Sequence, residues 1–447
     1  MSPSGAAVNR PSVLARAAGA LALAAATALG GVVATPTVSA ATADSPYVNP
    51  APGLKNVLWV GNNWEGTADA VQPDGDFHRI ARINIIPDRN ERLTEIYRDP
   101  ARLALYLGIR QMVGEGHDQY VDDMYSTKDG RNLIVSRPSF ADVVSIDIVT
   151  GEIAWRFPVQ GFRSDHMAVS PDGSQVAVSA STAKLVHVLD TATGREIGSF
   201  PSGDNAHENA YIKGGTQIVN ESIGNVWTPL DQPWADATKG ERVLQFVDAE
   251  TLQIIRRVDL RARLAEAGRP ELSIGVRPMT FSPDYRFMYF QVSFFHGFIE
   301  YDIKADTITR IVDLPVTPAG DVPREAHLLD SGHHGISMNP QGTQICVAGT
   351  MSDYATVVDR ETLQHGPLVS TGLKSYWVTT DLTGEHCFVS WAKSNTVSVL
   401  SFETGEEVAR IPVGYHPQRM RIGVAPQNWN GNPVPLPAPG NPLPVFS

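Results

Sequence analysis

Short apolar segments that run into tight polar turns recur along most of the chain. In Met167–Gly173 an apolar Met-Ala-Val segment leads into Ser-Pro-Asp-Gly, whose Pro, Asp and Gly suit the central positions of a β-turn. Val176–Ser179, Leu185–Leu189 and Arg195–Phe200 follow as three more apolar or alternating segments. The pattern predicts one unit of four short strands in about forty residues.

The inner strand and turn of this unit occur seven times. Most copies begin 42 or 43 residues after the one before, and two intervals are longer. A four-stranded unit with this period is typical of a β-propeller blade and not of a helical solenoid. The copies are Met124–Gly130, Met167–Gly173, Asn209–Gly215, Met279–Tyr285, Ile336–Gly342, Val378–Gly384 and Met420–Pro426, the last without the turn.

The last copy has no room for three further strands, because the chain after Met420–Val424 is rich in Pro, Asn and Gly. Three segments that precede the first copy, Asn56–Gly61, Phe77–Ile86 and Leu93–Tyr97, can supply them. We therefore expect an all-β, seven-bladed β-propeller closed by N-terminal strands that join the C-terminal inner strand. Such closure hides the edges that an open array of blades would expose.

The first forty residues predict a secretory signal peptide. They carry Arg10 and Arg16 and no acidic residue, hold an Ala-rich apolar run over Leu14–Val33, and end in small residues at Ala40. A membrane anchor is the alternative, and no later stretch reaches the roughly 20 apolar residues of a bilayer span. The expected product is secreted. The expected parts are a signal peptide (1–40), an N-terminal lead (41–55), the propeller (56–424) and a Pro-rich extended tail (425–447).

Two stretches, Met167–Gly203 and Val378–Pro417, carry the strand and turn motifs most clearly. They resemble the YVTN-type β-propeller repeats of secreted bacterial and archaeal proteins. The resemblance implies a secreted propeller and leaves function open, because such repeats occur in surface proteins, lactonase-like enzymes and subunits of redox enzymes. The literal Tyr-Val-Thr-Asn is absent. The matching segments are Ala168–Gly173, Val186–Asp190, Thr191–Gly194, Val397–Val399, Glu403–Gly405 and Val413–Pro417.

The net charge of the chain limits the kinds of molecule that it is expected to bind. The net charge is −12, and it becomes more negative when the two arginines of the signal peptide are removed. A nucleic-acid partner calls for a basic surface, so this balance argues against one. A small polar or anionic molecule is the expected partner, and a protein partner remains open.

Candidate functional side chains gather where a propeller opens. The loops that lead into the inner strands, and those between second and third strands, lie on one face and surround the channel mouth. Five of the 12 histidines, at positions 166, 207, 333, 334 and 416, fall in loops that lead into inner strands. Imidazole and carboxylate groups that converge on one axis can bind a divalent transition metal or act as acid and base.

These positions define three overlapping sets of candidates. The catalytic candidates are His166, His207, Glu208, His334 and Arg277. The ligand-binding candidates are Asp123, Arg137, Trp377, Tyr376, Lys393, Arg419 and His296. The metal candidates are His166, His207 and His333. The favoured interpretation is a small-molecule site, in a metal-assisted lyase, hydrolase or oxidoreductase. A non-catalytic extracellular propeller that binds a protein or cell-wall partner, with these groups as a solvated rim, is the alternative.

The two cysteines leave a choice open. Cys346 and Cys387 lie in the expected second strands of neighbouring blades, on opposite faces of their own sheets. A disulfide is plausible outside the cell. Facing sheets stand about 10 Å apart, which is wide for the bond, so two buried thiols are the other expectation.

Overall fold

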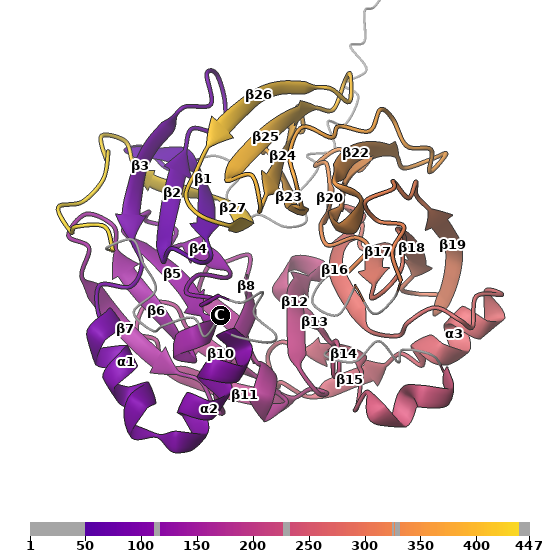
Figure 1. The fold of residues 1–447 in the computed structure, drawn as a ribbon, viewed down its shortest axis with the longest axis horizontal. Helices are drawn as coiled ribbons and strands as arrows, with labels where there is room; N and C mark the ends of the chain where they lie inside the picture. Colours follow the sequence, from indigo (N-terminus) through magenta and orange to yellow (C-terminus); the bar gives the residue numbers. More distant parts are fainter. Residues whose placement is uncertain (1–49, 111–116, 227–232, 324–325, 327–330, 438–447) are drawn as a thin grey trace, which may run out of the picture. The chain divides into compact units, whose positions relative to one another are not determined.

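The residues that the structure describes form one compact unit. The computed structural model describes residues 50–110, 117–226, 233–323, 326 and 331–437, and the expected signal peptide lies outside these residues. The strands form seven antiparallel sheets arranged around an axis (Figure 1). Six sheets have four strands and one has three. The expected seven-bladed β-propeller is confirmed.

Six of the blades follow one another along the chain, each built from the axis outward. The first three are β4 (Met124–Ser126), β5 (Asn132–Arg137), β6 (Asp142–Asp147) and β7 (Ile153–Pro158); β8 (Ser164–Val169), β9 (Gln175–Ala180), β10 (Leu185–Asp190) and β11 (Glu196–Pro201); and β12 (Ala206–Ile212), β13 (Gln217–Ser222), β14 (Leu244–Asp248) and β15 (Ile254–Arg257). The next three are β16 (Val276–Phe281), β17 (Phe287–Val292), β18 (Gly297–Asp302) and β19 (Thr307–Asp313); β20 (Ile336–Met338), β21 (Gln344–Gly349) and β22 (Tyr354–Asp359); and β23 (Ser375–Thr380), β24 (His386–Trp391), β25 (Thr396–Ser401) and β26 (Glu407–Pro412).

The seventh blade joins the two ends of the propeller. The inner strand β27 (Pro417–Pro426) pairs with β1 (Leu54–Asn62), and β2 (Thr67–Val71) and β3 (Arg79–Asn84) complete the sheet. The N-terminal segment therefore supplies three strands, as expected, and the ring is closed by hydrogen bonds between distant parts of the chain.

One of the three expected N-terminal strands is wrong. Leu93–Tyr97 lies in helix α1 (Arg89–Arg98), and β2 takes its place in the blade. Leu93 and Ile96, the buried residues of α1, are three positions apart, which places them on one face of a helix. The short strand β2 was missed because its sequence, Thr-Ala-Asp-Ala-Val, carries little apolar signal although all five residues are buried.

The helices occur in connections between blades. Asp99 caps α2 (Pro100–Gly108), accepting hydrogen bonds from two backbone N–H groups of its first turn. In the same way, the Asp259 side chain caps the third helix, α3 (Leu260–Glu266), by accepting a hydrogen bond from the backbone N–H of Ala262. No helix in the described parts of the chain has the length and apolar character that a bilayer span needs. The 3₁₀ turns are η2 (Pro138–Phe140), η3 (Ser181–Ala183), η4 (Lys213–Gly215), η5 (Pro233–Thr238) and η7 (Thr350–Ser352).

The cores lie between neighbouring blades. One buried cluster joins Ile134 and Val143 of one blade to Met167 and Val178 of the next. Alternate side chains of a strand point to opposite faces, so each sheet fills two such interfaces. The inner strands are buried on both faces, and this packing holds their first residues in place around the axis.

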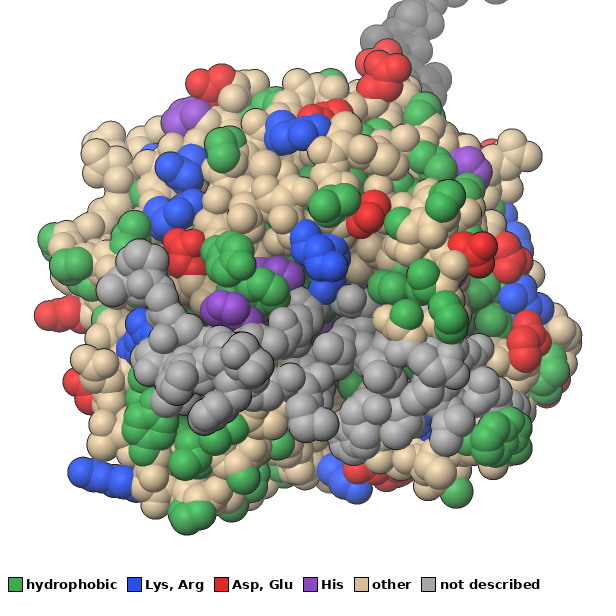
Figure 2. Space-filling view, in the orientation of Figure 1, with side chains coloured by type: hydrophobic (Ala, Val, Ile, Leu, Met, Phe, Trp, Pro, Cys, Tyr) green, Lys and Arg blue, Asp and Glu red, His purple; other side chains and the backbone are tan. Residues whose placement is uncertain are grey.

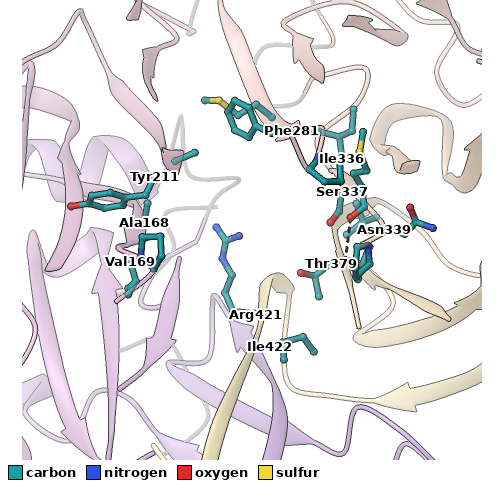
Figure 3. Close-up of a pocket in the computed structure, with 18 of the residues that line it drawn as sticks. Ala168, Val169, Tyr211, Phe281, Ile336, Ser337, Asn339, Thr379, Arg421 and Ile422 are labelled. Carbon is teal, nitrogen blue, oxygen red and sulfur yellow. Dashed lines mark hydrogen bonds between the residues drawn. The ribbon is translucent and has the colours of Figure 1, made fainter. Parts of the chain in front are cut away.

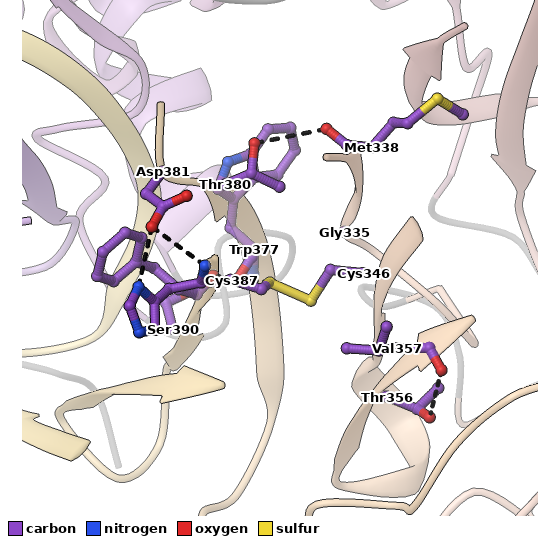
Figure 4. Close-up of a disulfide and its surroundings, with 12 residues drawn as sticks. Gly335, Met338, Cys346, Thr356, Val357, Trp377, Thr380, Asp381, Cys387 and Ser390 are labelled. Atoms are coloured by element: carbon purple, nitrogen blue, oxygen red, sulfur yellow. Dashed lines mark hydrogen bonds and ion pairs between the residues drawn. A yellow bond between two sulfur atoms is a disulfide. The ribbon is translucent and has the colours of Figure 1, made fainter. Parts of the chain in front are cut away.

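Cys346 and Cys387 form a disulfide between β21 and β24, with their Cα atoms 6.4 Å apart (Figure 4). The bond crosses the buried interface of two neighbouring blades, where it packs with Ala348, Val357 and Val389. Of the two expectations for the cysteines, the structure therefore has the disulfide. It links strands at the interface that the three-stranded blade shares with the next one.

Candidate functional site

Three histidines from three different blades meet near the axis. His166 lies in β8, His207 in β12, and His334 two residues before β20. All three are buried, and each offers one ring nitrogen within 4.8 Å of those offered by the other two. We call these residues the histidine group. On the face of the molecule seen in Figure 2, histidine side chains lie near the centre, beside Lys or Arg.

Two members of the histidine group are held by carboxylates. His166 Nδ1 lies 2.5 Å from Asp122 Oδ2, and His207 Nδ1 lies 2.5 Å from Glu221 Oε1. The two Nε2 atoms face each other at 2.8 Å. If each ring donates its Nδ1 proton to a carboxylate, both Nε2 lone pairs point into the same space. A cation placed there would bind both, in the carboxylate–histidine–metal arrangement common in metalloproteins.

His334 completes the group from the other side. Its ring centroid is 6.5 Å from that of His166 and 6.1 Å from that of His207, and it lies 4.4 Å from the Tyr376 ring. His334 Nδ1 is buried and has no hydrogen-bond partner among the described residues. Buried polar atoms are nearly always paired, so an unpaired one in a polar cluster indicates an ion, water or ligand.

Burial keeps the three rings neutral. It lowers the pKa of His166, His207 and His334 well below the usual histidine value, and neighbouring arginines lower each further. Arg419 acts on His166, and Arg277 acts on the other two. Neutral imidazole is the form that binds a metal. The group is therefore ready to bind a cation without first losing protons.

The carboxylates around His166 form a second candidate group. Asp122, Asp165 and His166 also bring one ligand atom each within 4.8 Å of the others. Asp165 Oδ1 is 3.4 Å from His166 Nδ1, and its Oδ2 accepts a hydrogen bond of 2.8 Å from Ser181 Oγ. Burial raises the pKa of Asp122 and of Asp165 to about 6. Since this group shares His166 with the first, its simplest role is to orient that ring.

An ion-pair layer lies next to the histidine group along the inner strands. Arg419 donates to Glu208 at 3.3 and 2.7 Å, and its guanidinium carbon stands 3.7 Å from the centre of the Trp377 ring. Arg421 donates to both oxygens of Asp123 at 2.9 and 2.8 Å. Burial raises the pKa of Glu208, and Arg419 opposes it. For Asp123, burial also raises the pKa, but Arg421 outweighs it and the pKa is lowered. The name ion-pair layer is used below for Arg419, Glu208, Trp377, Arg421 and Asp123.

The structure brings most of the sequence-predicted residues to the axis. Arg277 is buried, and its Nε donates to Ser293 Oγ at 2.9 Å. It is near enough to lower the pKa of two of the histidines. The predicted residues that lie in or beside the histidine group or the ion-pair layer are His166, His207, Glu208, His334, Arg277, Asp123, Trp377, Tyr376 and Arg419.

Four predicted residues lie elsewhere. His333 points away from the histidine group; its Nε2 is 3.2 Å from Tyr354 Oη, and its ring is 5.8 Å from that of the predicted residue His296. Arg137 is buried in ion pairs with Asp88 and Asp142, which tie the start of α1 to its blade. Lys393 is exposed in the turn between β24 and β25.

No role was predicted from the sequence for Glu221, near the end of β13, for Asp122, just before β4, or for Arg421. The signal for Arg421 was present, because Arg419 and Arg421 are two residues apart in β27 and side chains of a strand repeat with period two. The pairing of each carboxylate with a particular histidine had no signal in the sequence, since the partners come from different strands.

Fold and site together define a seven-bladed β-propeller with a buried group of His and Asp side chains that could hold a metal ion. No protein-family model and no curated protein matches the chain. Among solved structures 1602 chains match, as expected for a widespread fold. One is hydrazine synthase of Kuenenia stuttgartiensis, 17% identical with a TM-score of 0.40 over 63% of this chain and 95% of that one. A likeness this distant carries no argument about activity, and membership of the YVTN-type family stays a prediction.

Proposed function

We propose that the chain is a secreted metalloprotein whose histidine group binds one divalent transition metal ion, and that it uses the ion to act on a small polar or anionic molecule. The observation that carries the proposal is the convergence of three buried, neutral imidazoles from different blades, two of them backed by carboxylates. A solvated rim of unrelated residues would not pair its histidines in this way.

The spacing of the group is close to what a metal requires. Nitrogens bound to a tetrahedral zinc at 2.0–2.1 Å lie about 3.3 Å apart. In the structure the Nε2 atoms of His166 and His207 are 2.8 Å apart, and all ligand nitrogens of the group lie within 4.8 Å of one another. Small movements of the rings would bring these distances to the value that zinc requires. Imidazole ligands suit zinc, copper, iron and nickel.

The environment is suited to chemistry as well as to binding. Three protein ligands leave a fourth position for water or substrate, as in catalytic zinc sites. A bound ion would supply Lewis-acid polarisation or an activated water. Arg277 places a positive charge near His207 and His334, where it can stabilise an anionic substrate group. The Tyr376 ring packs beside the His334 ring and forms part of the aromatic surroundings of the group.

Two features support secretion. The N-terminal forty residues have the composition of a signal peptide, and the Cys346–Cys387 disulfide is of the kind that persists in oxidising compartments. The predicted resemblance to secreted propellers points the same way.

Replacing His207 by glutamine is expected to abolish stoichiometric metal binding. The variant removes one of three ligands and should lower affinity for zinc at least 100-fold, because the remaining two imidazoles make an incomplete site. The measurement is metal content of the secreted, untagged protein, followed by calorimetric titration with zinc, copper and manganese. His333→Gln is the matched control, since His333 is also a buried histidine but contacts Tyr354 outside the histidine group. No binding by the parent protein would refute the proposal and favour a non-catalytic binding or scaffolding propeller.

Replacing Glu221 by glutamine is expected to weaken metal binding by about 10- to 100-fold without removing it, as is usual when a partner of a ligand histidine is changed. The variant keeps the shape of the side chain but removes the carboxylate that holds His207 Nδ1. Glu196→Gln is the control, because Glu196 forms the same contact with His187 away from the axis. Equal zinc affinity for Glu221→Gln and the parent would show that the pair is structural only.

A further inference from the structure

A cavity of about 350 Å³ lies at the other end of the axis from the histidine group. The cavity is lined mainly by residues toward the ends of the inner strands and by the turns that follow these strands. The histidine group lies at the beginnings of the inner strands or just before them. The volume of the cavity falls in the range of small-molecule sites. The ion-pair layer lies between the cavity and the histidine group, and three of its residues, Glu208, Trp377 and Arg421, form part of the cavity wall.

Arg421 presents an accessible cationic group to this cavity. Its Nε and Nη2 donate to Asp123, while Nη1 has no partner among the described residues. The side chain is 13% exposed, and its guanidinium points into the middle of the cavity (Figure 3). The Tyr125 ring, 5.0 Å from the guanidinium carbon, supports it from one side. One end of the cavity therefore offers two N–H donors of a positively charged group whose orientation is fixed.

The cavity wall also carries two hydroxyl groups. Ser337 of β20 and Thr379 of β23 line the cavity from neighbouring blades, as Figure 3 shows, and their hydroxyls have no hydrogen-bond partner in the described part of the chain. Apolar and aromatic side chains make up much of the remaining wall, among them Tyr211, Phe281 and Met338. Few fixed polar groups in an otherwise apolar cavity are the usual composition of a specific small-molecule site.

We propose that this cavity is a second binding site, for a small organic acid that carries one carboxylate on an aromatic or other apolar body. The carboxylate accepts hydrogen bonds from Arg421 Nη1 and from the hydroxyls of Ser337 and Thr379, and the apolar body packs on the aromatic wall. The site does not depend on the proposed metal. Arg419, paired with Glu208 and stacked on Trp377, closes the axis between the two sites.

The test is calorimetric titration of the full chain with 1-naphthoate, its neutral amide and 1-naphthylmethylamine. We expect 1:1 binding of naphthoate, and at least tenfold weaker binding of the amide and the amine. Ser337→Ala/Thr379→Val should weaken naphthoate binding about three- to tenfold, and Arg421→Gln at least tenfold. If Arg421→Gln does not fold, Ser337→Ala/Thr379→Val still tests the proposal, because this double variant leaves every ion pair intact.

The control is His207→Gln, which should lose metal and keep naphthoate affinity. This result would separate the two proposals, since either site can then fail alone. The inference is overturned if the parent protein does not bind naphthoate, if the three probes bind equally, or if the folded cavity variants bind it as the parent does.

Discussion

Replacing Arg419 by methionine is expected to lower the free energy of unfolding by about 3–5 kcal/mol, the usual cost of removing one partner of a buried ion pair. Arg419 is fully buried, and both of its guanidinium contacts with Glu208 would be lost. Glu208 would keep only a 3.8 Å contact with Arg421. The negative charge of the Glu208 carboxylate would then be buried without a close positive partner. Urea unfolding followed by circular dichroism measures the effect.

The control is the double variant Arg419→Met/Glu208→Leu. Replacing both partners of a buried ion pair by apolar residues is often neutral. We therefore expect the double variant to regain most of the stability that the single variant loses. Equal losses in the two variants would show that Arg419 acts through packing on Trp377, 3.7 Å away, and not through its charge.

Removing the disulfide is expected to cost about 4 kcal/mol. The bond closes a loop with a sequence separation of 41, and loop-closure entropy of the unfolded chain gives this magnitude for a loop of that length. Cys346→Ala/Cys387→Ala is the variant to measure, because both positions lie in the buried interface between two blades and alanine leaves no unpaired polar atom there.

Reduction of the parent protein provides the control for this variant. The parent should lose stability in the presence of a reductant, and the double alanine variant should be insensitive to it. A urea midpoint for the variant that equals that of the oxidised parent would contradict the expectation.

The number of blades and the way the ring closes could be predicted from the sequence because both depend on local signals. Alternation of apolar residues and a Pro/Asp/Gly turn specify a strand and its end within ten residues, and their repetition counts the blades. Leu93–Tyr97 shows the limit of such signals. A short apolar run fits a strand or one face of a helix, and packing of Leu93 and Ile96 decided for the helix.

The sequence by itself determined that histidines, carboxylates and arginines gather at the first residues of the inner strands. Only the tertiary structure decided which of them meet. His333 and His334 are adjacent, yet His334 lies in the histidine group and His333 packs beside Tyr354. Neighbours in an extended chain point in opposite directions, so their roles depend on the register of a strand against its blade.

The same reason explains the disulfide, the pairing of Asp122 with His166 and the cavity at Arg421. Each joins residues of different blades, 41 positions apart for Cys346 and Cys387 and 44 for Asp122 and His166. Distances across an interface between blades depend on how two sheets pack, which no local pattern encodes. The sequence determined the blades and the residue types at the axis, and blade packing decided the contacts that make a site.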